Sequence, residues 1–144
     1  MQGYKVSYPV VYDLEDAKAS KLSAKTVSEM ALTFCNEVRR AGYYPMVYCN
    51  TNWYDNYIDW SLLSGVDVWI ARYGDTIQAP DKERYNYTIW QSTDGNRESG
   101  LNSTSGLVAG IPAGNDVDMD FWLCGLYKEN YAEMASFSSC SGIS

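Results

Sequence analysis

The sequence predicts an α/β fold that begins with one β-α-β unit and continues with strands joined by loops. An apolar stretch at 9–12 runs directly into acidic residues and is typical of a buried strand. An amphipathic helical pattern follows at 24–41, and a second apolar strand pattern follows at 44–50. A strand, a helix and a strand in this order imply parallel strands with a right-handed crossover.

The helix is predicted by its two ends and by one apolar face. Ser23 is a candidate N-cap, Arg39 and Arg40 lie in the last turn, and Gly42 follows as the candidate C-cap. Apolar side chains recur at intervals of three and four residues, as one buried face requires. They are Val27, Met30, Ala31, Phe34, Cys35 and Val38.

After the second strand, the helical signal weakens and short strands follow one another. The patterns predict an aromatic-rich helical segment at 52–63, strands at 66–73 and 87–92 with a loop at 74–84 between them, a surface loop at 93–105, a short strand at 108–111 and a last strand at 115–121. A complete βα barrel typically needs about 250 residues. About five strands in 144 residues cannot close a barrel of eight.

Composition limits the classes of function. The chain is 46% hydrophobic, which is typical of a globular domain. Its net charge of −7, without a basic patch, argues against nucleic-acid binding. It has no histidine, which removes Ser-His-Asp and Cys-His nucleophile systems and His-ligated zinc. If the protein is an enzyme, carboxylates would carry its acid–base chemistry, with tyrosine as a further candidate.

The four cysteines do not predict a metal site. Cys35, Cys49, Cys124 and Cys140 lack C-x-x-C spacing, so we expect no zinc and no cofactor. Cys35 and Cys49 are predicted to be buried, whereas a Cys124–Cys140 disulfide stays open for a secreted protein. No apolar run reaches the roughly 18 residues of a membrane span, and no signal peptide is visible at the N-terminus.

Two acids follow the first strand directly. Asp13 and Glu15 are two residues apart, so on a strand both carboxyls would point to one side at its C-terminal end. Two like charges this close raise one pKa, which makes one carboxyl a candidate proton donor. The alternative is that Asp13 and Asp16 are solvated loop acids or a helix cap. The thirteen tyrosines and five tryptophans suit a sugar-binding groove, and core packing is the alternative for many of them.

Five fragments occur in an order that resembles a known family. They are PVVYDLED, GYYPMVYCN, VDVWIARY, YTIWQS and NDVDMDFW, within residues 9–122. In these motifs the chain resembles glycoside hydrolase family 25, the Chalaropsis-type lysozymes (muramidases) of bacteria and phages. The resemblance implies a partial TIM-like (β/α)5(β)3 barrel that covers about the fourth to eighth strands. It also implies that residues 1–126 are the C-terminal part of the catalytic domain, with a tail or linker at 127–144.

The resemblance further implies an activity and a set of site residues. The activity would be hydrolysis of the β-1,4 bond between N-acetylmuramic acid and N-acetylglucosamine in peptidoglycan glycan strands. By the matching motifs, Glu15 would be the general acid, Asp13 would orient the 2-acetamido group or tune Glu15, and Asp118 would point into the site. Four residues at strand ends would line the groove, with barrel core as their alternative: Tyr48, Trp69, Tyr73 and Gln91. Such a protein would be secreted or bound to the bacterial cell wall, or would be a phage endolysin.

Two departures from the family pattern leave alternatives open. Asp120 stands where the family usually has asparagine, and the family's first strands, with a further acid, have no counterpart. We therefore expect exposed apolar surface around 10–12 or an intermolecular contact that covers it. The alternatives are a truncated, inactive domain that at most binds cell-wall glycan, and a different carboxylate glycosidase such as a chitin-acting one. The second partner could be the substrate's own acetamido oxygen or a carboxylate base for water.

Overall fold

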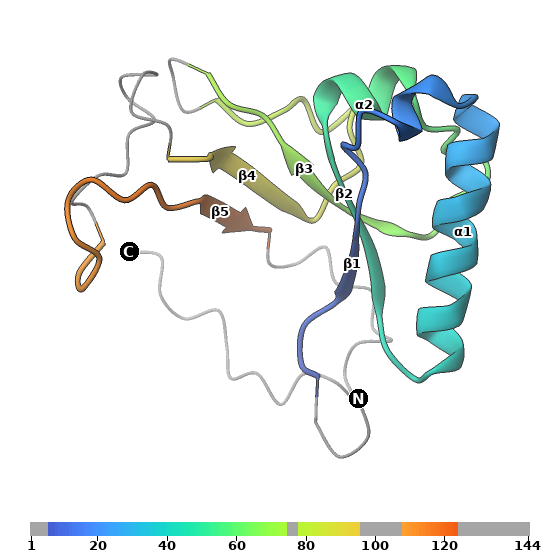
Figure 1. Ribbon diagram of the computed structural model, residues 1–144, viewed down its shortest axis with the longest axis horizontal. Coiled ribbons are helices and arrows are strands. Elements are labelled where there is room, and N and C mark those ends of the chain that lie inside the picture. The colour runs from blue at the N-terminus through green and yellow to red at the C-terminus, as the bar shows by residue number, and fades with distance from the viewer. Residues whose placement is uncertain (1–5, 75–77, 96–107, 124–144) are drawn as a thin grey trace.

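The computed structural model describes residues 6–74, 78–95 and 108–123 of the chain (Figure 1). Its elements, in chain order, are β1 (Val10–Asp13), the short 3-10 turn η1 (Ala19–Lys21), α1 (Ala24–Arg40), β2 (Pro45–Asn50), α2 (Thr51–Asn56), β3 (Asp67–Ala71), β4 (Ile89–Thr93) and β5 (Met119–Trp122). The predicted α/β class and the first β-α-β unit are confirmed.

The five strands form one sheet in the order β1-β2-β3-β4-β5. The first four strands are parallel, and β5 runs antiparallel beside β4. The carboxyl ends of β1 to β4 therefore meet at one edge of the sheet, where the start of β5 also lies. This topology is compatible with part of a barrel.

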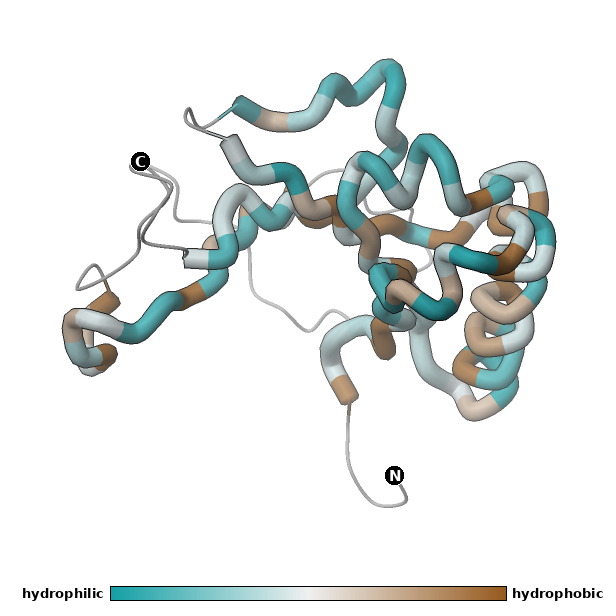
Figure 2. Tube along the Cα trace, turned by 45° about the horizontal axis from the view of Figure 1, so that its top comes forward, coloured by the Kyte–Doolittle hydropathy of each residue, from teal (hydrophilic) through white to brown (hydrophobic). Residues whose placement is uncertain are grey.

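The core lies between the sheet and α1, which contacts β1 and β2 (Figure 1). Because side chains alternate along a strand, Val47 and Cys49 of β2 are buried in this core while Tyr48 faces the other side of the sheet. The two faces of α1 are visible as alternating hydrophobic and hydrophilic residues in Figure 2. The predicted burial of Cys35 and Cys49 is confirmed, and both are free thiols. Cys124 and Cys140 lie outside the described residues.

The ends of α1 follow from local sequence. Ser23 is the N-cap as predicted, and its Oγ accepts a hydrogen bond from the backbone N–H of Thr26 at 3.1 Å. The C-cap is Ala41 rather than Gly42. Gly42 is the next residue and has φ +81°, a left-handed conformation that glycine adopts without steric cost.

The prediction for the apolar face of α1 is wrong at one residue, Met30. Met30 is 44% exposed, and Ser28 is fully buried in its place. The Ser28 Oγ accepts a hydrogen bond from the backbone N–H of Asp59 at 2.8 Å. The turn after α2 therefore packs over this position of α1 and requires a small polar side chain there.

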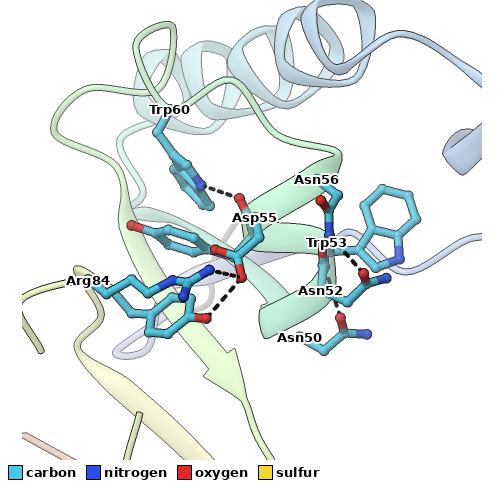
Figure 3. Close-up of polar contacts among 9 residues, drawn as sticks. Asn50, Asn52, Trp53, Asp55, Asn56, Trp60 and Arg84 are labelled. Atoms are coloured by element: carbon cyan, nitrogen blue, oxygen red, sulfur yellow. Dashed lines mark hydrogen bonds and ion pairs between the residues drawn. The ribbon is translucent and has the colours of Figure 1, made fainter. Parts of the chain in front are cut away.

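The aromatic segment is helical only in its first half. The N-cap Asn50 accepts a hydrogen bond from Trp53 N at 3.0 Å, but α2 ends at Asn56, and turns replace the helix predicted up to Leu63. Long-range contacts hold α2 instead (Figure 3). Asp55 accepts hydrogen bonds from Arg84 at 2.8 Å and from the Tyr85 hydroxyl at 2.9 Å.

The C-terminal strand predictions need two corrections. Residues 108–111 form a turn rather than a strand, with Ile111 N bonded to Val108 O at 3.1 Å and Gly110 at φ +85°. The last strand begins at Met119 instead of residue 115. The alternation of apolar residues and aspartates at 116–121 predicts a longer strand, but pairing with β4 begins only at Met119. The tail at 127–144 lies outside the described residues.

The expected apolar surface at β1 is present. Val10, Val11 and Tyr12 are all partly exposed, and among the described residues β1 pairs with β2 alone. Tyr12 stacks on Phe34 of α1 with ring centroids 4.8 Å apart. The strand is therefore covered on its helix side, and no described strand pairs with its outer edge.

We predict that Ser28→Ala lowers the free energy of unfolding by about 1–3 kcal/mol, because the Asp59 N–H loses its acceptor. Urea unfolding followed by circular dichroism measures this. Thr33→Ala is the matched control, since the Thr33 hydroxyl is exposed and bonds only back to Glu29 O; its effect should stay within about 0.5 kcal/mol. Equal effects of the two substitutions would contradict the role given to Ser28.

Candidate active site

An open cavity of about 340 Å³ lies on the face of the sheet opposite α1. All five strands contribute to it, either directly or through the residues that flank them. Its lining residues are Val11, Asp13, Glu15, Tyr48, Trp69, Gln91 and Asp118. The structure thus brings together six of the seven predicted site residues, and the seventh, Tyr73, contacts two of them.

Leu14 fixes the direction of the two acids on either side of it, at the end of β1. It is 4% exposed and belongs to the core on the helix side of the sheet. Its backbone N–H donates to Tyr48 O at 2.9 Å, which extends the pairing with β2 beyond Asp13. Because neighbouring side chains on a strand point to opposite faces, Asp13 and Glu15 both turn toward the cavity.

Asp13 and Glu15 are exposed residues whose carboxyls are partly desolvated, which raises the pKa of both. Burial raises the pKa of the Glu15 carboxyl, and the negative charge of Asp13 raises it further. Burial also raises the pKa of Asp13. The lining residues include no lysine or arginine that would stabilise the ionised forms. The predicted arrangement of a proton donor beside a second carboxyl is therefore physically consistent.

The Asp16 carboxylate bonds nearby backbone N–H groups and does not line the cavity. Its Oδ1 accepts hydrogen bonds from the N–H groups of Lys18 at 2.7 Å and Ala19 at 3.0 Å, at the start of η1. Asp16 is thus an exposed loop acid whose carboxylate bonds two backbone N–H groups, and the N-cap of η1 is Lys18. Asp13 is also exposed, but it lines the cavity.

A polar network crosses the floor of the cavity. Gln91 is 4% exposed, and its Oε1 accepts hydrogen bonds from the hydroxyls of Tyr48 at 2.7 Å and Tyr73 at 3.0 Å. Tyr48 also packs edge-to-face against Trp69, with ring centroids 5.2 Å apart. Three adjacent strands therefore hold these polar and aromatic groups in fixed positions.

Trp69 is a cavity residue and not a core residue. Its indole N–H donates to Asp120 Oδ1 at 2.7 Å, which anchors the ring from β5. Burial raises the pKa of Asp120, the Trp69 hydrogen bond lowers it, and the charge of Asp118 raises it. From the sequence, Asp120 was predicted only as an additional acid near the site. Its hydrogen-bond partner Trp69 is 51 positions away and is identified only by the fold. Sequence reasoning also missed Val11, whose position two residues before Asp13 was the available signal.

In the part of the chain that the structure describes, no three His, Cys, Asp or Glu side chains are grouped to hold a metal ion. None of the helices there is both long enough and apolar enough to cross a bilayer. The side chains that line the cavity supply carboxyl groups, a phenol, an amide and an indole.

A solved structure with a similar fold is the crystal structure of the CTP1L endolysin, described as showing how that enzyme's activity is regulated by a secondary translation product. The sequences are 22% identical, and the TM-score is 0.58. The similarity covers 92% of this chain but 39% of the endolysin chain, so this chain spans well under half of that protein.

A known protein family matches the sequence, whereas no curated protein does. The family described as "Glycosyl hydrolases family 25" matches residues 1–101, which include Asp13, Glu15, Tyr48, Trp69 and Gln91 and stop short of β5. This match extends over more than half of the 144 residues. The chain therefore belongs to glycosyl hydrolases family 25.

Proposed function

We propose that this chain carries the acid–base centre of a peptidoglycan hydrolase, a muramidase that cleaves the β-1,4 bond between N-acetylmuramic acid and N-acetylglucosamine. The observation that carries the proposal is the orientation of Glu15 and Asp13 into one cavity with aromatic walls. Family membership and the endolysin-like fold support it. The substrate would be the glycan strand of the cell wall, reached either by secretion or by phage lysis.

Glu15 is assigned as the general acid. Breaking a glycosidic bond requires a proton on the leaving oxygen, and a carboxyl with a raised pKa still holds that proton when most carboxyls are ionised. Asp13 has two effects in this proposal. Its charge raises the pKa of Glu15, and its carboxylate can accept the N–H of the 2-acetamido group.

The cationic centre that develops on the sugar needs a second partner. One route uses the acetamido oxygen of the substrate as nucleophile, with Asp13 holding the group in place. The other uses a carboxylate that activates water from the opposite face of the sugar. Asp118 faces the same cavity from the start of β5 and adds negative charge that stabilises this centre in either route.

The groove is assigned to Tyr48, Trp69, Tyr73 and Gln91. The Trp69 ring is held by Asp120 on one side and by Tyr48 on the other, so it offers a rigid apolar surface to a sugar ring. Gln91 and the two tyrosine hydroxyls supply polar groups beside it. Flat rings with a few fixed polar groups are typical of small-ligand sites.

We predict that Glu15→Gln lowers the release of reducing sugar from purified peptidoglycan by about 10²–10⁴-fold, the usual contribution of a general acid. Glu29→Gln is the control, because Glu29 is an exposed residue of α1 that pairs with Lys25. Full activity in Glu15→Gln would refute the assignment of Glu15. Release by neither Glu15→Gln nor the unmodified chain, with glycan binding retained, would favour the alternative of an inactive domain that binds cell-wall glycan.

The pH dependence tests Asp13 separately. The general acid must be protonated, so activity should fall as the pH rises through the pKa of Glu15. Asp13→Asn removes the charge that raises this pKa and should move the alkaline limb of the rate profile to lower pH. Glu37→Gln, on the exposed face of α1, should leave the limb in place. A limb that moves to higher pH in Asp13→Asn would contradict this account.

We also propose that an intermolecular contact covers the outer edge of β1. The support is the partly exposed strand, which pairs on one side only among the described residues. Light scattering should then give a mass above the 16.2 kDa of one chain at high protein concentration. A constant mass of one chain over a wide concentration range would contradict self-association at this edge.

A further inference from the structure

A single oxygen atom of Gln91 accepts hydrogen bonds from two tyrosine hydroxyls. The Gln91 Oε1 lies 2.7 Å from the Tyr48 hydroxyl and 3.0 Å from the Tyr73 hydroxyl, and both hydroxyls donate to it. A tyrosine hydroxyl carries one proton. The two hydroxyl oxygens are 3.4 Å apart. When both hydroxyl protons are donated to Gln91, neither is available for a hydrogen bond between the two hydroxyls. Each phenolic oxygen then presents only lone pairs to the cavity.

The acceptor lies on a strand that is paired on both sides. Gln91 is 4% exposed and lies opposite Ala71 of β3 and Asp120 of β5. Its backbone oxygen accepts a hydrogen bond from Arg72 N at 3.1 Å, which extends the pairing with β3. The backbone of Gln91 is therefore fixed, and its buried Oε1 orients both tyrosine hydroxyls before any substrate binds.

Tyr48 and Gln91 line the same cavity as Glu15, and the Tyr73 hydroxyl contacts both of them. Burial raises the pKa of each hydroxyl, and the negative charge of Glu15 adds to the rise in both. Among the described residues, no hydrogen-bond donor contacts the Glu15 carboxyl. The groups that share the cavity or its rim with Glu15 come from every strand: Asp13, Tyr48, Trp69, Tyr73, Gln91, Asp118 and Asp120.

We propose that Gln91 is a positioning residue that holds the protons of Tyr48 and Tyr73 away from Glu15 and thereby favours the protonated form of Glu15. A protonated carboxyl can donate to a phenolic lone pair, whereas an ionised carboxylate would find no donor in these two hydroxyls. This inference rests on the proposed role of Glu15 as general acid and explains how the proton stays available. It assigns Gln91 a function beyond lining the groove.

The test is a pH titration of Glu15 by ¹³C NMR of its side-chain carboxyl carbon, in the full chain and in Gln91→Leu. Leucine is similar in size but accepts no hydrogen bond, so the two hydroxyl protons must find another acceptor. A new hydrogen bond to the Glu15 carboxylate should lower the titration midpoint by about one pH unit, a tenfold change in the ionisation equilibrium. An unchanged or higher midpoint would overturn the proposal.

Two further variants separate this effect from damage to the fold. The triple variant Tyr48→Phe/Tyr73→Phe/Gln91→Leu has no hydroxyl protons to release, so its midpoint should return toward that of the unmodified chain. The double variant Tyr48→Phe/Tyr73→Phe, with Gln91 intact, should not raise the midpoint. A rise there would show that the tyrosines already donate to Glu15, and this would overturn the proposal even if Gln91→Leu did not fold.

Activity measured on the same variants distinguishes this inference from the proposed function. If peptidoglycan is hydrolysed, the alkaline limb of the rate profile should move to lower pH in Gln91→Leu, in step with the NMR midpoint. A shifted midpoint without any hydrolysis supports the role of Gln91 and counts against the function proposed for Glu15. Hydrolysis with an unmoved midpoint and limb counts against Gln91 alone.

Discussion

The burial of Leu14 is the constraint on which the cavity depends. This side chain enters the core beneath α1, and its N–H is bonded to Tyr48 O. A strand cannot bury one residue without turning both neighbours to the opposite face, because its side chains alternate. The apolar core that stabilises the fold therefore also aims Asp13 and Glu15 at the same space. A shift of one residue in the pairing of β1 would exchange the acids for Leu14.

This arrangement destabilises the ionised form of the carboxyl groups. Burial raises the pKa of Asp13, Glu15 and Asp120 above their ordinary values. An acid whose pKa is higher in the folded chain supports folding at low pH, and this support is lost as the pH rises through the raised pKa. The cavity thus disfavours its own ionised state. Such a local cost is typical of sites at which a proton must be held for chemistry.

Each of the strands β2 to β5 contributes one side chain to the contacts that support the cavity. Tyr48 comes from β2, Trp69 from β3, Gln91 from β4 and Asp120 from β5, and hydrogen bonds or ring contacts connect each one to another strand. Groups mounted on paired strands keep their positions better than groups on loops. The proposed function would need such fixed positions, since a small displacement of Glu15 from the glycosidic bond would weaken proton transfer.

The sequence by itself determined the first β-α-β unit and most of the strands, because these follow from periodicity, caps and strand ends within a few residues. Most of the residues that meet in the cavity were predicted from the motifs that resemble the family. Tertiary structure decided what depends on distant partners. Asp59 requires the buried Ser28, 31 positions away, and Asp120 holds Trp69 at the cavity, 51 positions away. Local patterns carry no information about such pairs. The antiparallel direction of β5 and the choice between Asp13 and Asp16 were also settled only by folding, which brings remote backbone groups into reach.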